Sequence, residues 1–146
     1  MYFFSSPILP ILLTAGLTSA VAETTLHNKC SYPVYYSAND ANAPSPDSYI
    51  VQDEWFDGIT GTALKVTKTR DGLWAGKPVL NFGYTVKNGE VWYDLSTVNG
   101  YDWWGEVVVL DGEKTGAETI VWKGEPGPNH VAHFKGELDL VLTTCA

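Results

Sequence analysis

Short β-rich runs separated by turn residues constrain the fold of this chain more than any other feature of its sequence. The runs are TLHNKCSYPVYYS, TALKVTKT, PVLNFGYTV, VWYDLSTV, EVVVL, ETIVWK and LDLVLTT, separated by turn signals such as KNGE, LDGE, KGEPGPN and ANDANAPSPDS. Asn88 and Gly89 supply the two positive-φ residues of a type I′ turn, so FGYTV and VWYDL should form a hairpin. No stretch has apolar residues at helical spacing over the length of a helix. The pattern predicts an all-β, two-sheet sandwich.

The first 22 residues, MYFFSSPILPILLTAGLTSAVA, are apolar and end in a small-x-small cleavage pattern. They are too short, and too interrupted by prolines, for a comfortable membrane span. We therefore predict a signal peptide at residues 1–22 and a single mature domain at residues 23–146. The product is expected to be secreted and extracellular, because no later run has the character of a membrane anchor.

Cysteine usage agrees with secretion. After removal of the leader, the chain contains Cys30 near its start and Cys145 near its end, and no other cysteine. In an oxidising compartment these two should form one disulfide that joins the N- and C-terminal segments. A reactive or metal-binding thiol pair is not predicted, because nothing resembles Cys-x-x-Cys.

The charge of the chain excludes two classes of partner. Its 146 residues include 9 Lys and Arg against 17 Asp and Glu, which gives a formal net charge of −8. Nucleic acid and anionic lipid would both be repelled by such a protein. We expect a monomer, long enough to bury a real hydrophobic core, that binds neither nucleic acid nor membranes.

Two segments resemble the thaumatin-like superfamily. HNKCSYPVYYS, which includes Cys30, is similar to the opening strand of that superfamily, and VWYDLSTVNGYD resembles its Tyr-Asp-Val-Ser-Leu-Val-Asp-Gly-Phe-Asn segment. The chain is more similar still to the small fungal branch, the yeast-phase-specific secreted proteins, in which GTALKVTKT resembles the strand after a Gly-rich turn. The resemblance implies a thaumatin-like antiparallel β-sandwich in which the first and last cysteines pair.

The same resemblance raises an enzymatic alternative. Some thaumatin-like proteins hydrolyse or bind β-1,3-glucans through an acidic cleft, and glycoside hydrolysis needs two carboxyl groups at a controlled separation. Where the family supplies a glutamate on one strand, this chain has Asn81, Phe82 and Gly83. Where the family turn supplies an aspartate, it has Asn99. Both departures argue against catalysis.

Three other acids could compensate for these losses. They are Asp94, Asp102 and Glu106, and together they define the alternative function, a weak endo-β-1,3-glucanase. Acids displaced along a turn point elsewhere, however, and catalytic geometry tolerates only about half an ångström of error. Solvated acids on an acidic surface are the favoured interpretation, so no catalytic residue is predicted.

The adjacent tryptophans Trp103 and Trp104 suggest a ligand-binding surface. Because neighbours on a strand face opposite sides, one ring should be buried and the other exposed. Counting in twos from EVVVL places Trp103, Gly105, Val107 and Val109 on one face and Trp104, Glu106 and Val108 on the other. Trp104 shares its face with a charge, so it is the predicted outward ring, with Asp102 and Glu106 beside it as ligand-binding residues.

A second candidate ligand site lies in the loop segment YIVQDEWFDGITG, where Asp53 and Asp57 surround Trp55. Calcium is not predicted there, because the EF-hand spacing is missing. The spacing of His130 and His133 puts them on opposite faces of any strand, which is unsuitable for chelation. We therefore predict no metal and no cofactor.

These features together predict a secreted, non-catalytic fungal protein that acts as a binding or interaction module at a cell wall or host interface. Its partner would be β-glucan or another cell-wall polysaccharide, or a host protein, and an effector or antigen role fits the same features.

Overall fold

The computed structural model describes residues 21–39, 49–51, 55–56 and 63–146, and within these residues the chain forms strands, turns and loops but no helix. Accordingly, this part of the chain holds no helix that could cross a membrane. The strands are β1 (Val21–Asn28), β2 (Val34–Asn39), β3 (Tyr49–Val51), β4 (Trp55–Phe56), β5 (Ala63–Thr67), β6 (Val79–Lys87), β7 (Glu90–Val98), β8 (Val107–Gly112), β9 (Ile120–Lys123), β10 (Val131–Lys135) and β11 (Leu138–Thr144).

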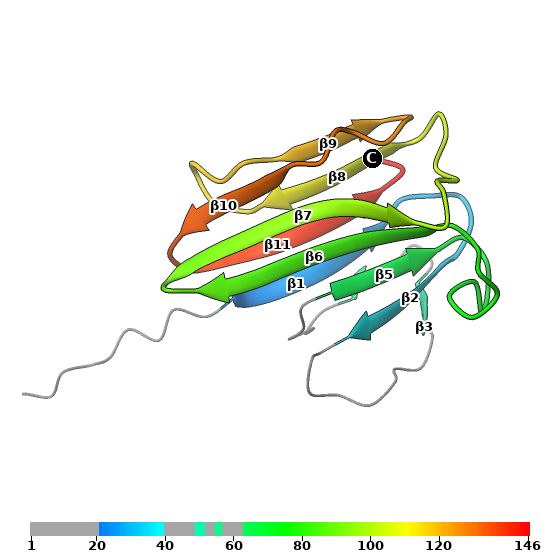
Figure 1. The fold of residues 1–146 in the computed structure, drawn as a ribbon, viewed down its shortest axis with the longest axis horizontal. Coiled ribbons are helices and arrows are strands. Elements are labelled where there is room, and N and C mark those ends of the chain that lie inside the picture. Colours follow the sequence, from blue (N-terminus) through cyan, green and yellow to red (C-terminus); the bar gives the residue numbers. More distant parts are fainter. Residues whose placement is uncertain (1–20, 40–48, 52–54, 57–62) are drawn as a thin grey trace, which may run out of the picture.

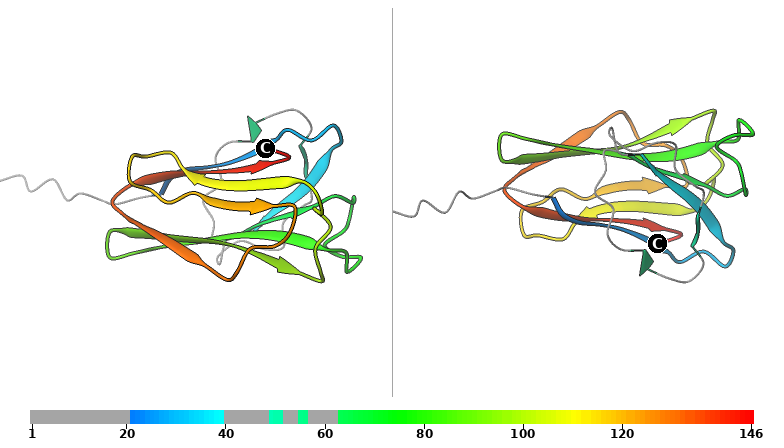
Figure 2. Two further views of the ribbon diagram at one scale, coloured as in Figure 1. Left: turned by 90° about the horizontal axis from the view of Figure 1, so that it is seen from above. Right: turned by 90° about the horizontal axis from the view of Figure 1, so that it is seen from below.

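The strands form two sheets that lie one on the other as two layers (Figures 1 and 2). One sheet has the order β4-β1-β11-β8-β9, and the other has the order β10-β7-β6-β5-β2-β3. All neighbours pair antiparallel except β1 and β11, which run parallel in the middle of the five-stranded sheet. The prediction of an all-β, two-sheet architecture is therefore confirmed, but the expectation of a wholly antiparallel sandwich is wrong at the pair of β1 and β11.

The predicted Asn-Gly hairpin is confirmed as well. Asn88 has a φ of 54° and Gly89 a φ of 74°, the backbone conformation that a type I′ turn requires. From this turn β6 and β7 pair along their whole length, from Lys87 opposite Glu90 to Val79 opposite Val98. The hairpin fixes which side chains of β7 face the other sheet.

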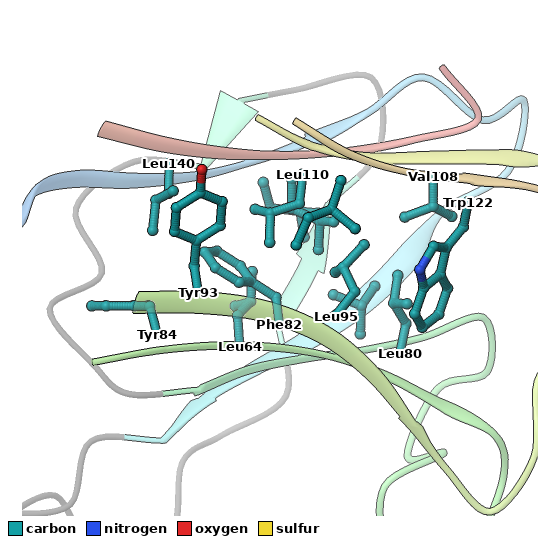
Figure 3. Packing of buried hydrophobic residues seen from close by; sticks show 14 of the residues in the cluster. Leu64, Leu80, Phe82, Tyr84, Tyr93, Leu95, Val108, Leu110, Trp122 and Leu140 are labelled. Atoms are coloured by element: carbon teal, nitrogen blue, oxygen red, sulfur yellow. The ribbon is translucent and has the colours of Figure 1, made fainter. Parts of the chain in front are cut away.

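Buried side chains of the two sheets fill the space between the layers. Phe82, Tyr93 and Leu95 project from the six-stranded sheet toward Leu110 and Leu140 of the five-stranded sheet (Figure 3). All five are at most 3% exposed. The inward side chains of β7 alternate with outward ones, as expected for strands with one buried face.

The predicted disulfide is present. Cys30 and Cys145 are bonded, with 5.0 Å between their Cα atoms and a sequence separation of 115. Cys30 follows β1 and Cys145 follows β11, so the bond joins the ends of the two parallel strands. The disulfide therefore fastens the N-terminal and C-terminal parts of the chain at one end of the sandwich.

One run that the sequence suggests as a single strand is two strands in different sheets. TLHNKCSYPVYYS contains the end of β1 and most of β2, and the chain reverses between them. The Asn28 side chain accounts for the break, because its amide donates to the Tyr32 carbonyl at 2.9 Å and its oxygen accepts from the Cys30 N–H at 3.0 Å. The same oxygen also accepts from the Thr144 hydroxyl at 2.9 Å. Asn28 thus replaces strand pairing with a side-chain-stabilised turn.

Candidate functional site

The segment that connects β7 to β8, residues 99–106, contains the predicted Trp104 site and is called the Trp104 loop here. Asn99 and Gly100 begin it with φ angles of 59° and 98°. Near its end, the N–H of Gly105 donates to the carbonyl of Gly124 at 3.0 Å, and the N–H of Gly124 donates to the carbonyl of Glu106 at 2.9 Å. These reciprocal bonds attach the loop to the chain that leaves β9.

The prediction that Trp103 is buried and Trp104 exposed is confirmed. Trp103 is 0% exposed and Trp104 is 64% exposed. The strand alternation from which this was derived is wrong, because Val108 is buried in the core together with Trp103, whereas the prediction put them on opposite faces. The strand begins only at Val107, and Gly105, with a φ of 79°, lies in a turn before it that resets the alternation.

Trp104 is held in place by other aromatic rings. The Tyr101 ring meets Trp104 edge-on, with 5.3 Å between centroids and 88° between planes. On its other side Tyr101 lies 5.8 Å from the buried Trp122 ring, at 65°. Burial, followed by the charges of Glu106 and Asp102, raises the pKa of Tyr101 to about 12, so the phenol is neutral at physiological pH. The exposed Trp104 ring therefore packs against Tyr101, which in turn packs against the buried Trp122.

Glu106 lies in a polar cluster against Lys68, which directly follows β5. The Lys68 ammonium is 2.5 Å from Glu106 Oε2, and the Tyr32 hydroxyl donates to Glu106 Oε1 at 2.5 Å. Lys68 also donates to the Asp102 carbonyl at 2.7 Å and lies 4.6 Å from the centroid of the Trp103 ring. We call Lys68, Glu106, Tyr32, Asp102 and Trp103 the Lys68 cluster.

The Lys68 cluster also contacts the disulfide. The Tyr32 hydroxyl is 3.6 Å from Cys145 Sγ, and the centroid of the Tyr32 ring lies 5.1 Å from the Lys68 ammonium. Burial and the hydrogen bond to Glu106 raise the pKa of Tyr32 above its ordinary value, so this hydroxyl stays protonated and donates to the carboxylate. Both carboxylate oxygens of Glu106 are thus occupied within the protein.

Asp102 faces the interior more than the ligand hypothesis supposed. Its Oδ1 atom is buried and accepts no hydrogen bond from the residues that the structure describes. Burial raises the pKa of this carboxyl, Lys68 and a backbone hydrogen bond lower it in part, and the charge of Glu106 raises it again. Of the two acids predicted to assist Trp104, Glu106 is therefore occupied by Lys68 and Tyr32, and Asp102 is partly inaccessible.

Asp94, the third acid of the enzymatic alternative, lies elsewhere. It is in β7, on the outer face of the six-stranded sheet, between Gly83 of β6 and Val131 of β10. Burial raises its pKa, and a backbone hydrogen bond from Gly83 partly lowers it, but neither Asp102 nor Glu106 contributes. The structure therefore brings Asp102 and Glu106 together around Lys68 and places Asp94 on a separate surface.

The second predicted ligand site falls largely outside the described residues. Asp53 and Asp57 lie outside them, and Trp55 is described only through its backbone in β4, where it pairs with His27 of β1. Both histidines that the sequence analysis considered are described. His133 lies in β10, whereas His130 precedes this strand and its Nε2 atom is 2.7 Å from Glu118 Oε1. In the described part of the chain, no group of three or more potential metal ligands lies together.

Comparison with known proteins identifies relatives of the chain. The family model Bys1, described as Blastomyces yeast-phase-specific protein, matches residues 11–146. No curated protein sequence matches the chain significantly. Among solved structures, the protein elicitor MoHrip2 from Magnaporthe oryzae is similar, with a TM-score of 0.67 and 17% identity over 85% of this chain and 98% of that chain. At that identity the likeness shows a common fold.

Proposed function

The chain belongs to the Blastomyces yeast-phase-specific protein family, and from this membership we propose that it is a secreted, non-catalytic host-interaction protein of a fungus. The structural neighbour MoHrip2 is a protein elicitor, which supports an extracellular role as effector or antigen. The disulfide between Cys30 and Cys145 supports secretion, because such bonds persist in oxidising compartments.

The exposed ring of Trp104 is the observation that carries the proposal. A tryptophan that is 64% exposed and already fixed by Tyr101 loses little conformational entropy when a partner covers it. Rigid tryptophans of this kind supply much of the binding energy at protein interfaces. The nearby Glu106 carboxylate is occupied by Lys68 and Tyr32, so it has little capacity left for sugar hydroxyls. We infer that the partner at the Trp104 loop is a protein on the surface of the host.

Replacing Trp104 with alanine is expected to weaken binding to host cells by about 30-fold, since a central tryptophan typically contributes about 2 kcal/mol or more. The measurement is a binding isotherm of the labelled, purified protein on intact host cells. Trp74→Ala is the matched control, because Trp74 is also 64% exposed but lies outside the loop. Equal affinities of the two variants would contradict the proposal.

Cell-wall polysaccharide is the alternative partner, and the same variants test it. The protein would be mixed with insoluble β-glucan and with chitin, and the bound fraction measured after sedimentation. Retention that is lost in Trp104→Ala and kept in Trp74→Ala would assign the Trp104 loop to polysaccharide instead of protein. The protein partner is supported if Trp104→Ala leaves the fraction bound to the polysaccharides unchanged but weakens binding to host cells.

The purified protein is expected to release no reducing sugar from β-1,3-glucan. Glu106 is held by Lys68 and Tyr32, and Asp94 lies on a different surface, so these acids offer no pair of free carboxyl groups facing one sugar. A reducing-sugar assay on soluble and insoluble glucan measures this. Activity that disappears in Asp94→Asn or Asp102→Asn would instead establish the glucanase alternative.

We further propose that the sandwich is a thaumatin-like one. The resemblance supports it, because HNKCSYPVYYS and VWYDLSTVNGYD occur in the expected order, the first around Cys30 and the second around β7. An experimentally determined structure whose strand order matches that of a thaumatin-like protein would establish the relationship, and a different order would remove it.

A further inference from the structure

The outer face of β6, β7 and β10 holds a second arrangement of aromatic and polar side chains, apart from the Trp104 loop. Strand alternation turns Trp92 and Asp94 of β7 outward, because Val91, Tyr93 and Leu95 point into the core. The neighbouring strands place residues directly beside them in two rows, which are Thr85–Trp92–His133 and Gly83–Asp94–Val131.

Trp92 is supported from one side. Its ring stacks on the His133 ring of β10, with 4.8 Å between centroids and 21° between planes, and the residue remains 39% exposed. His133 covers one side of the indole, Thr85 is the neighbour of Trp92 on the opposite strand, and part of the indole remains open to solvent. Trp92 is thus a preformed stacking platform, fixed by a cross-strand contact.

Hollows lie on both sides of Trp92 along the hairpin. One, of about 220 Å³, includes Gly83, Trp92 and Asp94 in its lining. The other, of about 380 Å³, lies toward the hairpin turn, where Lys87 and Glu90 join Trp92 in the lining. From Asp94 to Glu90 the strand rises about 14 Å, at about 3.4 Å per residue. The two hollows therefore form one elongated surface with the indole in its middle.

Gly83 lines the first hollow and is paired with Asp94 across the hairpin. Glycine inside a strand often marks a place where a ligand approaches closely. Asp94 at the floor of this hollow is half-buried and forms no ion pair with the described residues. Burial raises the pKa of its carboxyl, as expected for an acid without a charged partner.

We propose that this face binds a linear, uncharged oligosaccharide, with one pyranose ring on Trp92 and neighbouring units in the two hollows. The exposed indole suits the apolar face of a sugar ring, and Asp94 and Thr85 suit its hydroxyl groups. Lys87 and Glu90 carry opposite charges at the far end and offset each other, while Asp94 and the net charge of −8 disfavour an acidic ligand. The site is separate from the Trp104 loop and does not depend on the protein partner proposed there.

The test uses the intact secreted protein and three probes, the hexasaccharides of β-1,3-glucose, β-1,4-glucose and β-1,4-N-acetylglucosamine. Isothermal titration measures the affinity for each. We expect at least one to bind, and we expect Trp92→Ala to weaken it by about tenfold or more. Trp92→Tyr should retain part of the affinity, because it keeps a ring. Asp94→Asn should weaken binding several-fold, while Trp74→Ala should bind as the unmodified protein does.

Circular dichroism and thermal unfolding confirm that each variant is folded, so a loss of binding is assigned to the site. Absence of binding to all three hexasaccharides would overturn the proposal, and so would equal affinity of Trp92→Ala and the unmodified protein. Trp92-dependent binding of an oligoarginine peptide, without binding of the saccharides, would identify a cation site and overturn it as well. A result here leaves the Trp104 experiment unaffected, because that experiment measures binding to host cells and depends on a different tryptophan.

Discussion

Replacing Cys30 and Cys145 together with alanine is expected to lower the free energy of unfolding by about 4 kcal/mol. The disulfide closes a loop across a sequence separation of 115 residues, and without it the unfolded chain regains that conformational freedom. The measurement is guanidinium unfolding of the two proteins in the same buffer, followed by tryptophan fluorescence, with the midpoint and the slope compared.

Reduction of the unmodified protein supplies the control for this experiment. The reduced protein and the double alanine variant should unfold at nearly the same denaturant concentration, since both lack the covalent link. A loss below about 1 kcal/mol in both would show that the parallel pairing of β1 with β11 holds the termini together without the bond.

Replacing Lys68 with methionine is expected to lower the free energy of unfolding by about 3 kcal/mol. The side chains of Lys68 and Glu106 are only 21% and 27% exposed, so removal of the ammonium leaves a largely shielded carboxylate without its cation. The variant also loses the cation above the Trp103 ring. Chemical unfolding at neutral pH measures the loss.

Lys65→Met is the matched control, because Lys65 lies in β5 just before Lys68, with its side chain on the outer face of the sheet. It should change stability by no more than about 0.5 kcal/mol. A second variant, Lys68→Met combined with Glu106→Gln, should recover part of the loss, since no unpaired charge remains. If Lys68→Met were as mild as Lys65→Met, the Lys68 cluster would contribute little to folding.

The parts of the fold that follow from local sequence could be predicted. The Asn88-Gly89 turn needs positive φ at two positions, and few other dipeptides supply it, so the hairpin of β6 and β7 followed directly. The disulfide followed from the two cysteines and from the prediction that the chain is secreted into an oxidising compartment. The break between β1 and β2 was not predicted, although Asn28 makes its turn bonds with the nearby Cys30 and Tyr32. Its further bond with Thr144, 116 residues away, had no signal in the sequence.

The face assignment around Trp104 failed for a related reason. Alternation holds only while the backbone stays extended, and the turn at Gly105 lies between Trp103 and the first residue of β8. The exposure of Trp104 was predicted correctly, but on an alternation that does not exist in the structure. A glycine before a strand-like run was the available signal that the counting should have stopped there.

The Lys68 cluster had no signal in the sequence. Lys68 lies 38 residues before Glu106, and a lysine in TALKVTKT looks like an ordinary solvated strand residue. The surface around Trp92 was partly predictable, because the Asn-Gly register turns Trp92 and Asp94 outward together. The contribution of His133 to this surface could not be predicted, because β10, which contains His133, lies in a segment where no strand was predicted.

The parallel pairing of β1 with β11 has a consequence for how the protein is made. Strand β11 lies between β1 and β8, so the five-stranded sheet cannot assemble until a segment more than a hundred residues after β1 has left the ribosome. Contacts so distant in sequence also form slowly, because a long loop must close before they can stabilise the chain. The nascent chain therefore passes through most of its synthesis without a complete five-stranded sheet.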